Sequence, residues 1–593
     1  MGEEGGGRSC GITKELQKLK QQAMEYYREN DVPRRLEELL NSTFYLQPAD
    51  VYGHLANYFS KLAKPPTICR VVGKSILDGL GLPTLQVEIF CIIQNFSKHI
   101  CSVEISTDFE VLENALPELV DAEEAERNMA VNMAVQWINE AITEELQGLI
   151  PTKQAEVDQV LRTFFANKVQ EDKERKELEK TMEESTAPAP PPVIPPPLPQ
   201  PPSKKKGPKS GRKETLVEKP IPPAEPPEAV LCGSMAIGAV SLAIAKTSAT
   251  LDNIPLYLNM ALLKHNQEQP AALTMPLLMG SLVSCGKSSP GKLNLMKEVI
   301  CIPHPGLSTK QGVEMLLEIQ KQISKAMETL PPPKAETKKG HDSSKRGQGA
   351  CANLGLELGT NLHLAINCAG QELMDYSKGK YEVMGGTYKN TTEMVDLYVD
   401  LINKYPSIIA LIDPFRKEDV ELWESIYTAL GSKCYIIAGA ASKSIPKLLE
   451  NQITSIPKCH GLILRHTNQT TMSDMVEITN LIDSKKQIVI LGTTEGESSD
   501  DSLVDLAVGL GVRFIKLGGP SRGERVTKYN RLLNIEEELV QNGTWGASEE
   551  HTFFPFTEDA AKSLEPPTTA PSELLAPLEP IFPTEVVEDS TKT

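Results

Sequence analysis

The sequence lacks the features typical of secreted, membrane-spanning and nucleic-acid-binding proteins. Residues 1–7 contain no apolar segment of the signal-peptide kind, and no uninterrupted apolar stretch in the 593 residues is long enough to cross a bilayer. Basic residues are not in excess, because 61 Lys and Arg stand against 79 Asp and Glu, a formal net charge of −18. None of the 11 cysteines forms a Cys-x-x-Cys pair, which indicates reduced thiols rather than disulfides or a zinc site. We therefore expect a cytoplasmic protein that binds neither nucleic acid nor a membrane.

Three stretches are too poor in apolar residues to form a core. A Pro- and Lys-rich insert spans 185–228, a polar and basic segment spans 331–349, and an acidic Pro-rich tail, expected to be disordered, spans 551–593. The proline runs of the insert fit either a linker or a ligand of an SH3 or WW module. These stretches separate segments with the composition of folded domains.

A regular alternation of apolar and amphipathic segments runs from Leu362 to Lys516. The apolar runs predict strands at Leu362–Ala365, Ile408–Ile412, Cys434–Ala438, Gly461–Leu464, Gln487–Leu491 and Phe514–Lys516. The amphipathic stretches predict helices at Thr392–Asn403, Asp419–Leu430, Ile445–Glu450, Met472–Ser484 and Ser502–Gly509. Five or more such units in series favour a closed (β/α) barrel over an open doubly wound sheet. No Gly-x-Gly-x-x-Gly opens a helix here, which weakens the dinucleotide-binding alternative.

Few charged residues follow the predicted strands, although barrel chemistry sits at the C-terminal ends of strands. Asp413 is the one carboxylate placed directly at such an end, and Arg465 and Lys516 are the cations. Small polar residues fill most of the other positions. By themselves these strand ends predict an anion site rather than a metal site.

Several motifs resemble those of the enolase family. Asp413-Pro414-Phe415 resembles the family's Glu-Asp-Pro-Phe motif, and the segments Ile515–Gly518 and Arg522–Leu539 are similar to its C-terminal signature. The segment Gly233–Ala243 resembles the helix that enters the enolase barrel, and Asp78–Thr84 resembles the opening hairpin of the family. The resemblance covers residues 68 to 545 and implies an α/β fold, an enolase-type barrel with an α+β N-terminal capping domain. We therefore expect a capping domain at 66–245 and the barrel at 246–550, interrupted by the insert and the polar segment.

The resemblance also implies a chemistry. Enolases are glycolytic lyases that remove the C2 proton of 2-phosphoglycerate and expel hydroxide. A lysine acts as the base, and two magnesium ions stabilise the dianionic intermediate. In this chain the three positions that match the family's magnesium-binding carboxylates hold Asn367, Ile412 and Ala440. An amide, an alkyl group and a methyl group cannot replace three anionic ligands, and Asp413 alone would bind the ion weakly. The family resemblance thus implies magnesium binding, whereas the residues at these positions argue against it.

Other positions keep part of the family pattern. The lysine base position falls on Arg465, which stays protonated in proteins and cannot act as a base. Lys516 matches the substrate-binding lysine, and Glu298 matches a glutamate with catalytic and substrate-binding roles. The mobile-loop histidine position holds Ser289, and the loop that donates a serine ligand corresponds to Ser106-Thr107.

Two further segments depart from the family, and each site residue has a plainer interpretation. Gly492-Thr493-Thr494-Glu495 replaces the family's phosphate-binding segment, and Glu495 would repel a phosphate; the Asp-Glu-Gly-Gly-Phe segment has no counterpart. Lys516 and Glu298 could be ion-pair partners, and Asp413 could cap the loop that follows it. His466, beside the base position, could titrate or could be a loop histidine with its bonding satisfied.

The N-terminal segment 1–65 predicts a small helical module. Pro33 suits the first turn of a helix, with Asn30 or Asp31 as its cap. Two apolar stripes follow, one formed by Val32, Leu36, Leu39 and Leu40, and the other by Val51, Leu55, Tyr58 and Phe59. Two short helices cannot bury both stripes alone, so we expect a homodimer with a four-helix arrangement.

This module resembles the docking and dimerisation domain of protein kinase A regulatory subunits and Dpy-30-like proteins. The resemblance implies a groove for an amphipathic helix of a scaffold or cytoskeletal protein. The alternative is a helical cap that packs on the barrel.

Two functions follow from the sequence. The first is an enolase-type lyase acting on 2-phosphoglycerate, supported by Lys516 and Glu298. The second is a non-catalytic enolase-fold scaffold, tethered through its N-terminal dimer. The pattern is similar to a divergent, sperm-associated branch of the family, which implies a place in the sperm flagellum.

Overall fold

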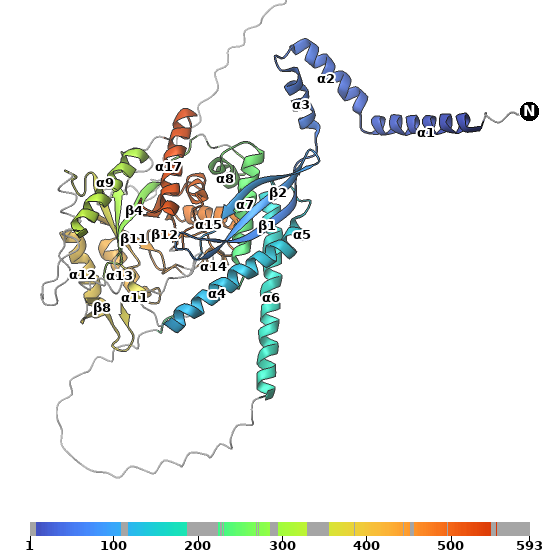
Figure 1. Ribbon diagram of the computed structural model, residues 1–593. Helices are drawn as coiled ribbons and strands as arrows, with labels where there is room; N and C mark the ends of the chain where they lie inside the picture. Colours follow the sequence, from blue (N-terminus) through green and yellow to red (C-terminus); the bar gives the residue numbers. More distant parts are fainter. Residues whose placement is uncertain are drawn as a thin grey trace, which may run out of the picture.

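The computed structural model describes residues 7–107, 117–186, 223–225, 228, 230–268, 270, 272–284, 295–328, 355–384, 386–442, 444–450, 456–494, 496–546 and 553. Figure 1 shows a barrel, a neighbouring sheet with its helices, and a projecting group of N-terminal helices. Ser289, Glu495, the segment 331–349, most of the insert and almost all of the tail lie outside the described residues. No helix in the described part of the chain is both long and apolar enough to cross a membrane.

Eight strands close into a barrel in the order β10-β11-β12-β13-β14-β4-β5-β6. Their bounds are β4 Leu277–Ser284, β5 Glu298–Pro303, β6 Leu362–Asn367, β10 Ile408–Ile412, β11 Tyr435–Ala438, β12 Gly461–Leu464, β13 Ile488–Gly492 and β14 Phe514–Gly518. β5 runs antiparallel to both neighbours, and the other adjacent pairs are parallel. Branched and aromatic side chains fill the interior, among them Ile412, Ile437, Tyr435 and Phe514.

The predicted barrel is confirmed. The six predicted strands match β6 and β10–β14 within two residues at each end, because strands buried on both faces appear as continuous apolar runs. The outer helices with predicted counterparts are α12 Thr391–Lys404, α13 Val420–Leu430, α14 Ile445–Glu450, α15 Met472–Ser484 and α16 Ser502–Gly509, each within one residue of its prediction. α12 begins at a capping box, in which Asn390 Oδ1 accepts from Glu393 N (2.9 Å) and Glu393 Oε2 accepts from Asn390 N (2.9 Å).

Some elements of the barrel region were not predicted individually. They are β4, β5, helices α9 Thr309–Glu328, α11 Gly370–Leu373 and α17 Gly523–Gln541, and a small antiparallel sheet of β7 Met374–Asp375, β8 Lys380–Met384 and β9 Thr387–Lys389. The helix α17 carries the similarity to the C-terminal signature, and the small sheet lies between β6 and α12. β4 and β5 complete the barrel and place Glu298 at its rim.

A three-stranded antiparallel sheet adjoins the barrel. It consists of β1 Thr67–Leu77, β2 Pro83–Ile93 and β3 Phe96–Glu104, followed by α4 Pro117–Gln136, a π-helical turn Trp137–Ile142, α5 Thr143–Leu146 and α6 Gln154–Thr186. The predicted hairpin connects β1 to β2: Asp78 Oδ1 accepts from Leu80 N (2.8 Å) and Leu82 N (2.9 Å), and Gly81 takes a positive φ of 78°.

Helix α7, Met235–Leu251, joins this sheet to the barrel. Most of its residues are buried, and it packs against β2, β3, α6, α15 and the following helix α8, Leu256–Lys264. A buried polar network supports the contact, since Ser241 Oγ donates to Asp158 Oδ1 (2.6 Å) and Ser473 Oγ donates to Asp158 Oδ2 (2.6 Å). The sheet and the outer barrel layer therefore share one continuous core.

The N-terminal helices are α1 Gly7–Glu29, α2 Val32–Leu46 and α3 Val51–Leu62. They project away from the barrel rather than cover it, and Gln94 Nε2 donates to Ser60 Oγ (2.8 Å) where α3 reaches the sheet. Asp31 lies at the N-cap of α2 as expected, but its carboxylate pairs with Arg34 instead of a backbone N–H. The helical nature of this segment is confirmed; its predicted pairing with a second copy stays a prediction.

Candidate functional site

The candidate site lies at the barrel rim formed by the C-terminal ends of the parallel strands. Because β5 runs against its neighbours, its first residue, Glu298, reaches this same rim and lies beside Asn367, the last residue of β6. Lys516 lies in β14, level with Gly492 of β13 and Met279 of β4. Residues far apart in the sequence thus meet through strand order and direction.

Lys516 and Glu298 form a part-buried ion pair. The Lys516 Nζ lies 3.0 Å from Glu298 Oε2 and 3.2 Å from Oε1, and the two side chains are 15% and 19% exposed. Asn367 Nδ2 donates to Glu298 Oε2 (2.8 Å), and Ser281 Oγ donates to Oε1 (3.1 Å). Burial by itself would raise the pKa of Glu298, but the charge of Lys516 and these donors outweigh it and hold the pKa at about 2. The two residues predicted to bind substrate are therefore together, and each neutralises the other.

The residues at the predicted magnesium positions do not fit a magnesium ion. Asn367 turns its Nδ2 to Glu298, while its Oδ1 accepts from Ala369 N (3.1 Å). Ile412 is buried in the barrel interior, and Ala440 offers a methyl group. Magnesium requires several oxygen ligands in near-octahedral order, and these side chains supply no free carboxylate. Within the described ranges, no group of three His, Cys, Asp or Glu residues is placed to hold a metal ion.

Asp413 holds the loop that follows the neighbouring strand β11. Its carboxylate accepts three backbone N–H bonds, from Gly439 (2.8 Å), Ala440 (2.7 Å) and Ala441 (3.0 Å). The side chain is buried, and its backbone has a positive φ of 47°. Burial raises the pKa of Asp413, and the three N–H donors and nearby Arg465 only partly oppose this. Asp413 therefore caps a loop, but this loop follows β11 and not Asp413 itself as the sequence interpretation expected, and both carboxylate oxygens are occupied.

Arg465 and His466 follow β12 and differ in their bonding. The Arg465 guanidinium makes no hydrogen bond or ion pair with any described residue, and it lines a cavity. His466 is part-buried; its Nε2 lies 3.0 Å from the Thr470 carbonyl oxygen, and burial lowers its pKa to about 4. His466 is thus a neutral loop histidine near neutral pH, with one ring nitrogen bonded to the backbone.

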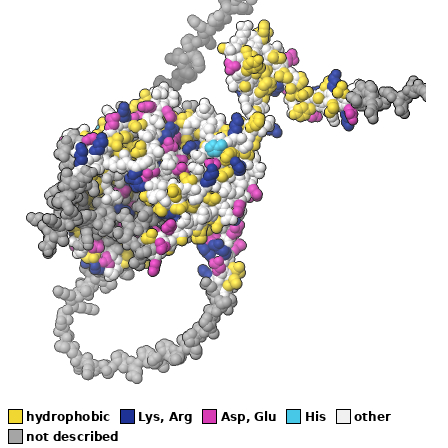
Figure 2. Space-filling model, viewed as in Figure 1, with side chains coloured by type: hydrophobic (Ala, Val, Ile, Leu, Met, Phe, Trp, Pro, Cys, Tyr) yellow, Lys and Arg dark blue, Asp and Glu magenta, His cyan; other side chains and the backbone are white. Residues whose placement is uncertain are grey.

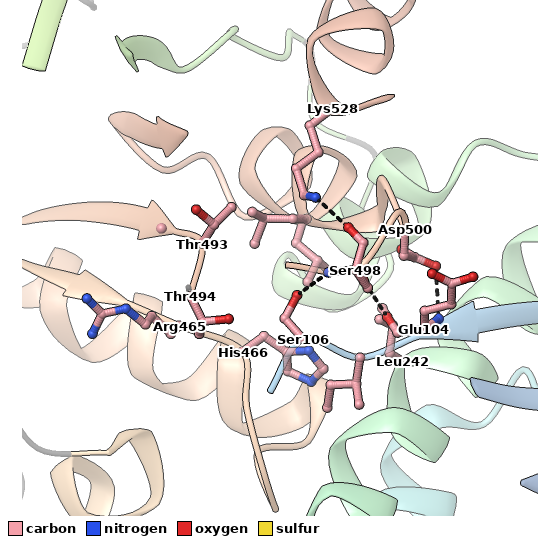
Figure 3. Close-up of a pocket in the computed structure, with 14 residues that line it drawn as sticks. Glu104, Ser106, Leu242, Arg465, His466, Thr493, Thr494, Ser498, Asp500 and Lys528 are labelled. Carbon is pink, nitrogen blue, oxygen red and sulfur yellow. Dashed lines mark hydrogen bonds between the residues drawn. The ribbon is translucent and has the colours of Figure 1, made fainter. Parts of the chain in front are cut away.

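The cavity lies between the ends of β12 and β13, the helices α16 and α17, and the neighbouring sheet (Figure 3). It has about 440 Å³ of empty space, part of it open to solvent. Its charged and hydroxyl-bearing lining residues are Glu104, Ser106, Arg465, Thr493, Thr494, Ser498, Asp500 and Lys528. Two cations and two carboxylates leave this described lining without a net charge, and Lys516 and Glu298 do not belong to it.

The segment Gly496–Asp500 closes one side of the cavity and is clamped from the sheet. Thr107 N donates to Gly496 O (3.2 Å), and Ser499 Oγ donates to Glu104 Oε2 (2.8 Å). A Cβ on residue 496 would lie 2.2 Å from Thr107 Oγ1, so this close approach requires glycine. The predicted Ser106-Thr107 segment therefore lies at the rim, where it fixes a loop.

Helix α17 clamps the same segment from the other side. The Lys528 Nζ donates to Ser498 O (2.9 Å) and Glu524 O (2.7 Å), and it lies 3.3 Å from Glu497 Oε2. Arg525, one turn earlier, pairs with Glu497 at 3.2 Å. The sequence prediction gave these residues no role. The spacing of Arg525 and Lys528 on one helix face signals a shared acceptor, but nothing in the sequence identifies Glu497 as that acceptor.

The predicted site residues therefore fall into three groups. Glu298, Lys516 and Asn367 form a closed polar cluster, Asp413 holds a loop with Ala440, and Arg465 and His466 line the cavity. Arg465 can attract an oxyanion, but the described residues beside it offer no free general base. Ser289 and Glu495 lie outside the described residues.

Comparisons with known proteins agree with this architecture. Residues 347–553 match the family described as enolase, C-terminal TIM barrel domain. The chain is 74% identical to a protein from Homo sapiens named Enolase 4, over 100% of this chain and 99% of that one. It is 69% identical to the Enolase 4 of Mus musculus over 100% of both chains, and 49% identical to that of Xenopus laevis over 92% of this chain and 96% of the relative.

Proposed function

The chain belongs to the enolase family, and we propose that it serves there as a non-catalytic scaffold whose N-terminal helices attach it to a partner. The observation that carries the proposal is the state of the magnesium positions. Asn367, Ile412 and Ala440 offer no anionic ligand, and the nearby carboxylate of Asp413 is committed to three backbone N–H groups. Without magnesium, the dianionic intermediate of the family reaction lacks its main electrostatic stabilisation.

The base position supports the same conclusion. Arg465 cannot accept a proton from carbon, and His466 is bonded to the Thr470 carbonyl at 3.0 Å. Lys516 and Glu298 are the residues that support the alternative, an enolase-type lyase, but they form an ion pair with each other. An activity assay distinguishes the two functions.

The deciding experiment measures phosphoenolpyruvate formation from 2-phosphoglycerate by the purified full-length protein with magnesium. We expect no turnover above background, and the same trace from Lys516→Ala. Activity at ordinary enolase levels that Lys516→Ala abolishes would overturn the scaffold proposal. Activity that Lys516→Ala leaves unchanged would identify contaminating host enolase, because the substitution cannot affect another protein.

The N-terminal helices support attachment through their exposed apolar surface. Only Leu39 is buried among the described side chains of α2 and α3, whereas Leu36, Leu40, Val51 and Phe59 are 42%, 64%, 43% and 43% exposed. Figure 2 shows hydrophobic side chains gathered on this projecting pair. We infer a homodimer through α2 and α3, with a groove for an amphipathic helix of a scaffold or cytoskeletal protein.

The resemblance to a sperm-associated branch of the family makes the flagellum the place to test this attachment. Removal of residues 1–62 is expected to abolish dimerisation and co-sedimentation with axonemal structures, while the thermal unfolding of the barrel is retained. If the truncated chain still sediments with axonemes, attachment through these helices is wrong.

A further inference from the structure

Helix α1 carries an apolar seam that is separate from the surface of α2 and α3. Leu16, Leu19, Ala23 and Tyr26 follow at steps of three, four and three residues, the spacing of a and d positions in a coiled coil. All four are exposed, Leu16 by 67%, Leu19 by 62% and Tyr26 by 62%. In the sequence, Ile12 continues the same spacing. We propose that α1 pairs with the α1 of a second copy of this chain in a parallel two-stranded coiled coil.

The charges beside the seam select both the partner and its direction. With Leu16 at a and Leu19 at d, Glu15 occupies a g position and Lys20 the following e position. In a parallel homodimer, g faces the next e of the other helix, so Glu15 of each copy meets Lys20 of the other. In an antiparallel pair, g faces g and e faces e, so Glu15 does not meet Lys20. The g positions hold Arg8, Glu15, Gln22 and Glu29, and their one cation, Arg8, lies in the first turn of α1.

The seam on α1 is not covered by the sheet or the barrel of the same chain, because α1 leaves α2 in the opposite direction (Figure 1). Asn30 Nδ2 donates to Tyr26 O (2.8 Å), Asp31 takes a positive φ of 55°, and Arg34 pairs with both Asp31 and Glu38. These local bonds fix the turn so that α1 points away from the sheet and the barrel (Figure 1). No described side chain from Lys14 to Glu29 is buried.

The lack of packing along α1 also argues for a second strand. Most of the stability of a helix in a protein comes from packing its apolar face, and no described side chain of α1 is buried. Pairing along the seam would cover Leu16, Leu19 and Tyr26 and place two symmetric Glu15–Lys20 contacts at its edges. This coiled coil is a contact additional to the α2–α3 dimer inferred above, and it depends on different residues.

The test uses cysteine cross-linking in the full-length chain carrying Cys10→Ser. A parallel, in-register pair places residue 23 of each copy opposite itself, so Ala23→Cys should form a disulfide-linked dimer rapidly under mild oxidation. The matched control is Gln21→Cys, at an f position that faces away from the seam. Equal cross-linking rates for the two variants would overturn the proposal.

Charge exchange supplies the second arm. In the Ala23→Cys background, Glu15→Lys or Lys20→Glu should each slow cross-linking on the order of tenfold, and the two together should restore it, because opposite charges meet again. A double exchange no faster than the single ones would also overturn the proposal. Sedimentation distinguishes the two interfaces. If the chain is a dimer that does not cross-link at Ala23→Cys, the coiled coil is ruled out and the α2–α3 dimer is retained. If the chain is a monomer, both interfaces are ruled out.

Discussion

Replacing Lys516 by methionine tests the ion pair that closes the barrel rim. The substitution keeps the length of the aliphatic stem and removes the charge that faces Glu298 at 3.0 Å. Among the described residues, Glu298 would then keep Asn367 and Ser281 as its donors and would remain part-buried. Breaking a buried pair by removing one partner leaves an uncompensated charge, and such changes cost about 3–5 kcal/mol.

The shifted pKa of Glu298 gives an independent magnitude. Its pKa falls from 4.5 to about 2 on folding. A depressed carboxyl pKa contributes stability that is complete above the unfolded value, and the contribution is lost as pH falls through the folded value. At ~1.4 kcal/mol per pKa unit the contribution is about 3 kcal/mol, fully present at pH 7 and lost between about pH 5 and pH 2.

The assay is urea unfolding followed by circular dichroism, at pH 7 and at steps down to pH 3.5. Lys516→Met should lower the free energy of unfolding by about 3–5 kcal/mol at pH 7, and the double variant Glu298→Gln/Lys516→Met should recover most of it. The double variant should also lose the part of the acid sensitivity that belongs to Glu298. A Lys516→Met protein within about 0.5 kcal/mol of wild type would refute the reasoning, because that is the effect of an exposed pair.

Three further predictions concern other parts of the chain. Asp413→Ala should cost about 3–5 kcal/mol in urea unfolding because it strips three N–H groups, two of them buried, of their acceptor, while Asp413→Asn, which keeps one oxygen, should cost less; equal costs would contradict the loop-holding role. His466, with its pKa lowered to about 4, favours folding above its unfolded pKa near ~6.5, and this contribution is lost as pH falls towards 4, so His466→Gln should flatten the stability profile in that window. Leu39→Ala should lower amide-exchange protection in α2 and α3 but not in β10–β14, since Leu39 is the buried residue of that helix pair; loss of protection throughout would show that the module supports the barrel.

The barrel was predictable from sequence to the extent that its strands are buried on both faces. Ile408–Ile412 and Gly461–Leu464 are continuous apolar runs, and their predicted ends agree with β10 and β12. The direction of β5 was not predictable, because a six-residue apolar strand carries no sign of whether its neighbours run with it or against it. That direction decides that Glu298 begins its strand at the rim and meets Lys516.

The roles of individual site residues were less accessible, because they depend on backbone groups. Asp413 is recognisable in the sequence as a carboxylate at a strand end, but its three donors are the N–H groups of a loop after a different strand. Backbone donors exist at every residue except proline and leave no sequence signal. The cavity residues Glu104 and Asp500 lie 396 positions apart in the sequence, and the bond between them, from Glu104 N to the Asp500 carboxylate, likewise uses a backbone donor.

The barrel rim can pack well without a metal ion because its carboxylates have partners within the protein. Carboxylates gathered for a metal repel one another when the metal is absent, whereas here Glu298 has its own cation and Asp413 has its own N–H donors. Arg465 is the rim cation that the described residues leave without a bonded partner, so an arriving anion would be attracted chiefly to it. An active member of the family divides anion binding and proton abstraction between metal ions and a lysine. In this chain Arg465, at the predicted base position, can perform the first of these tasks and not the second.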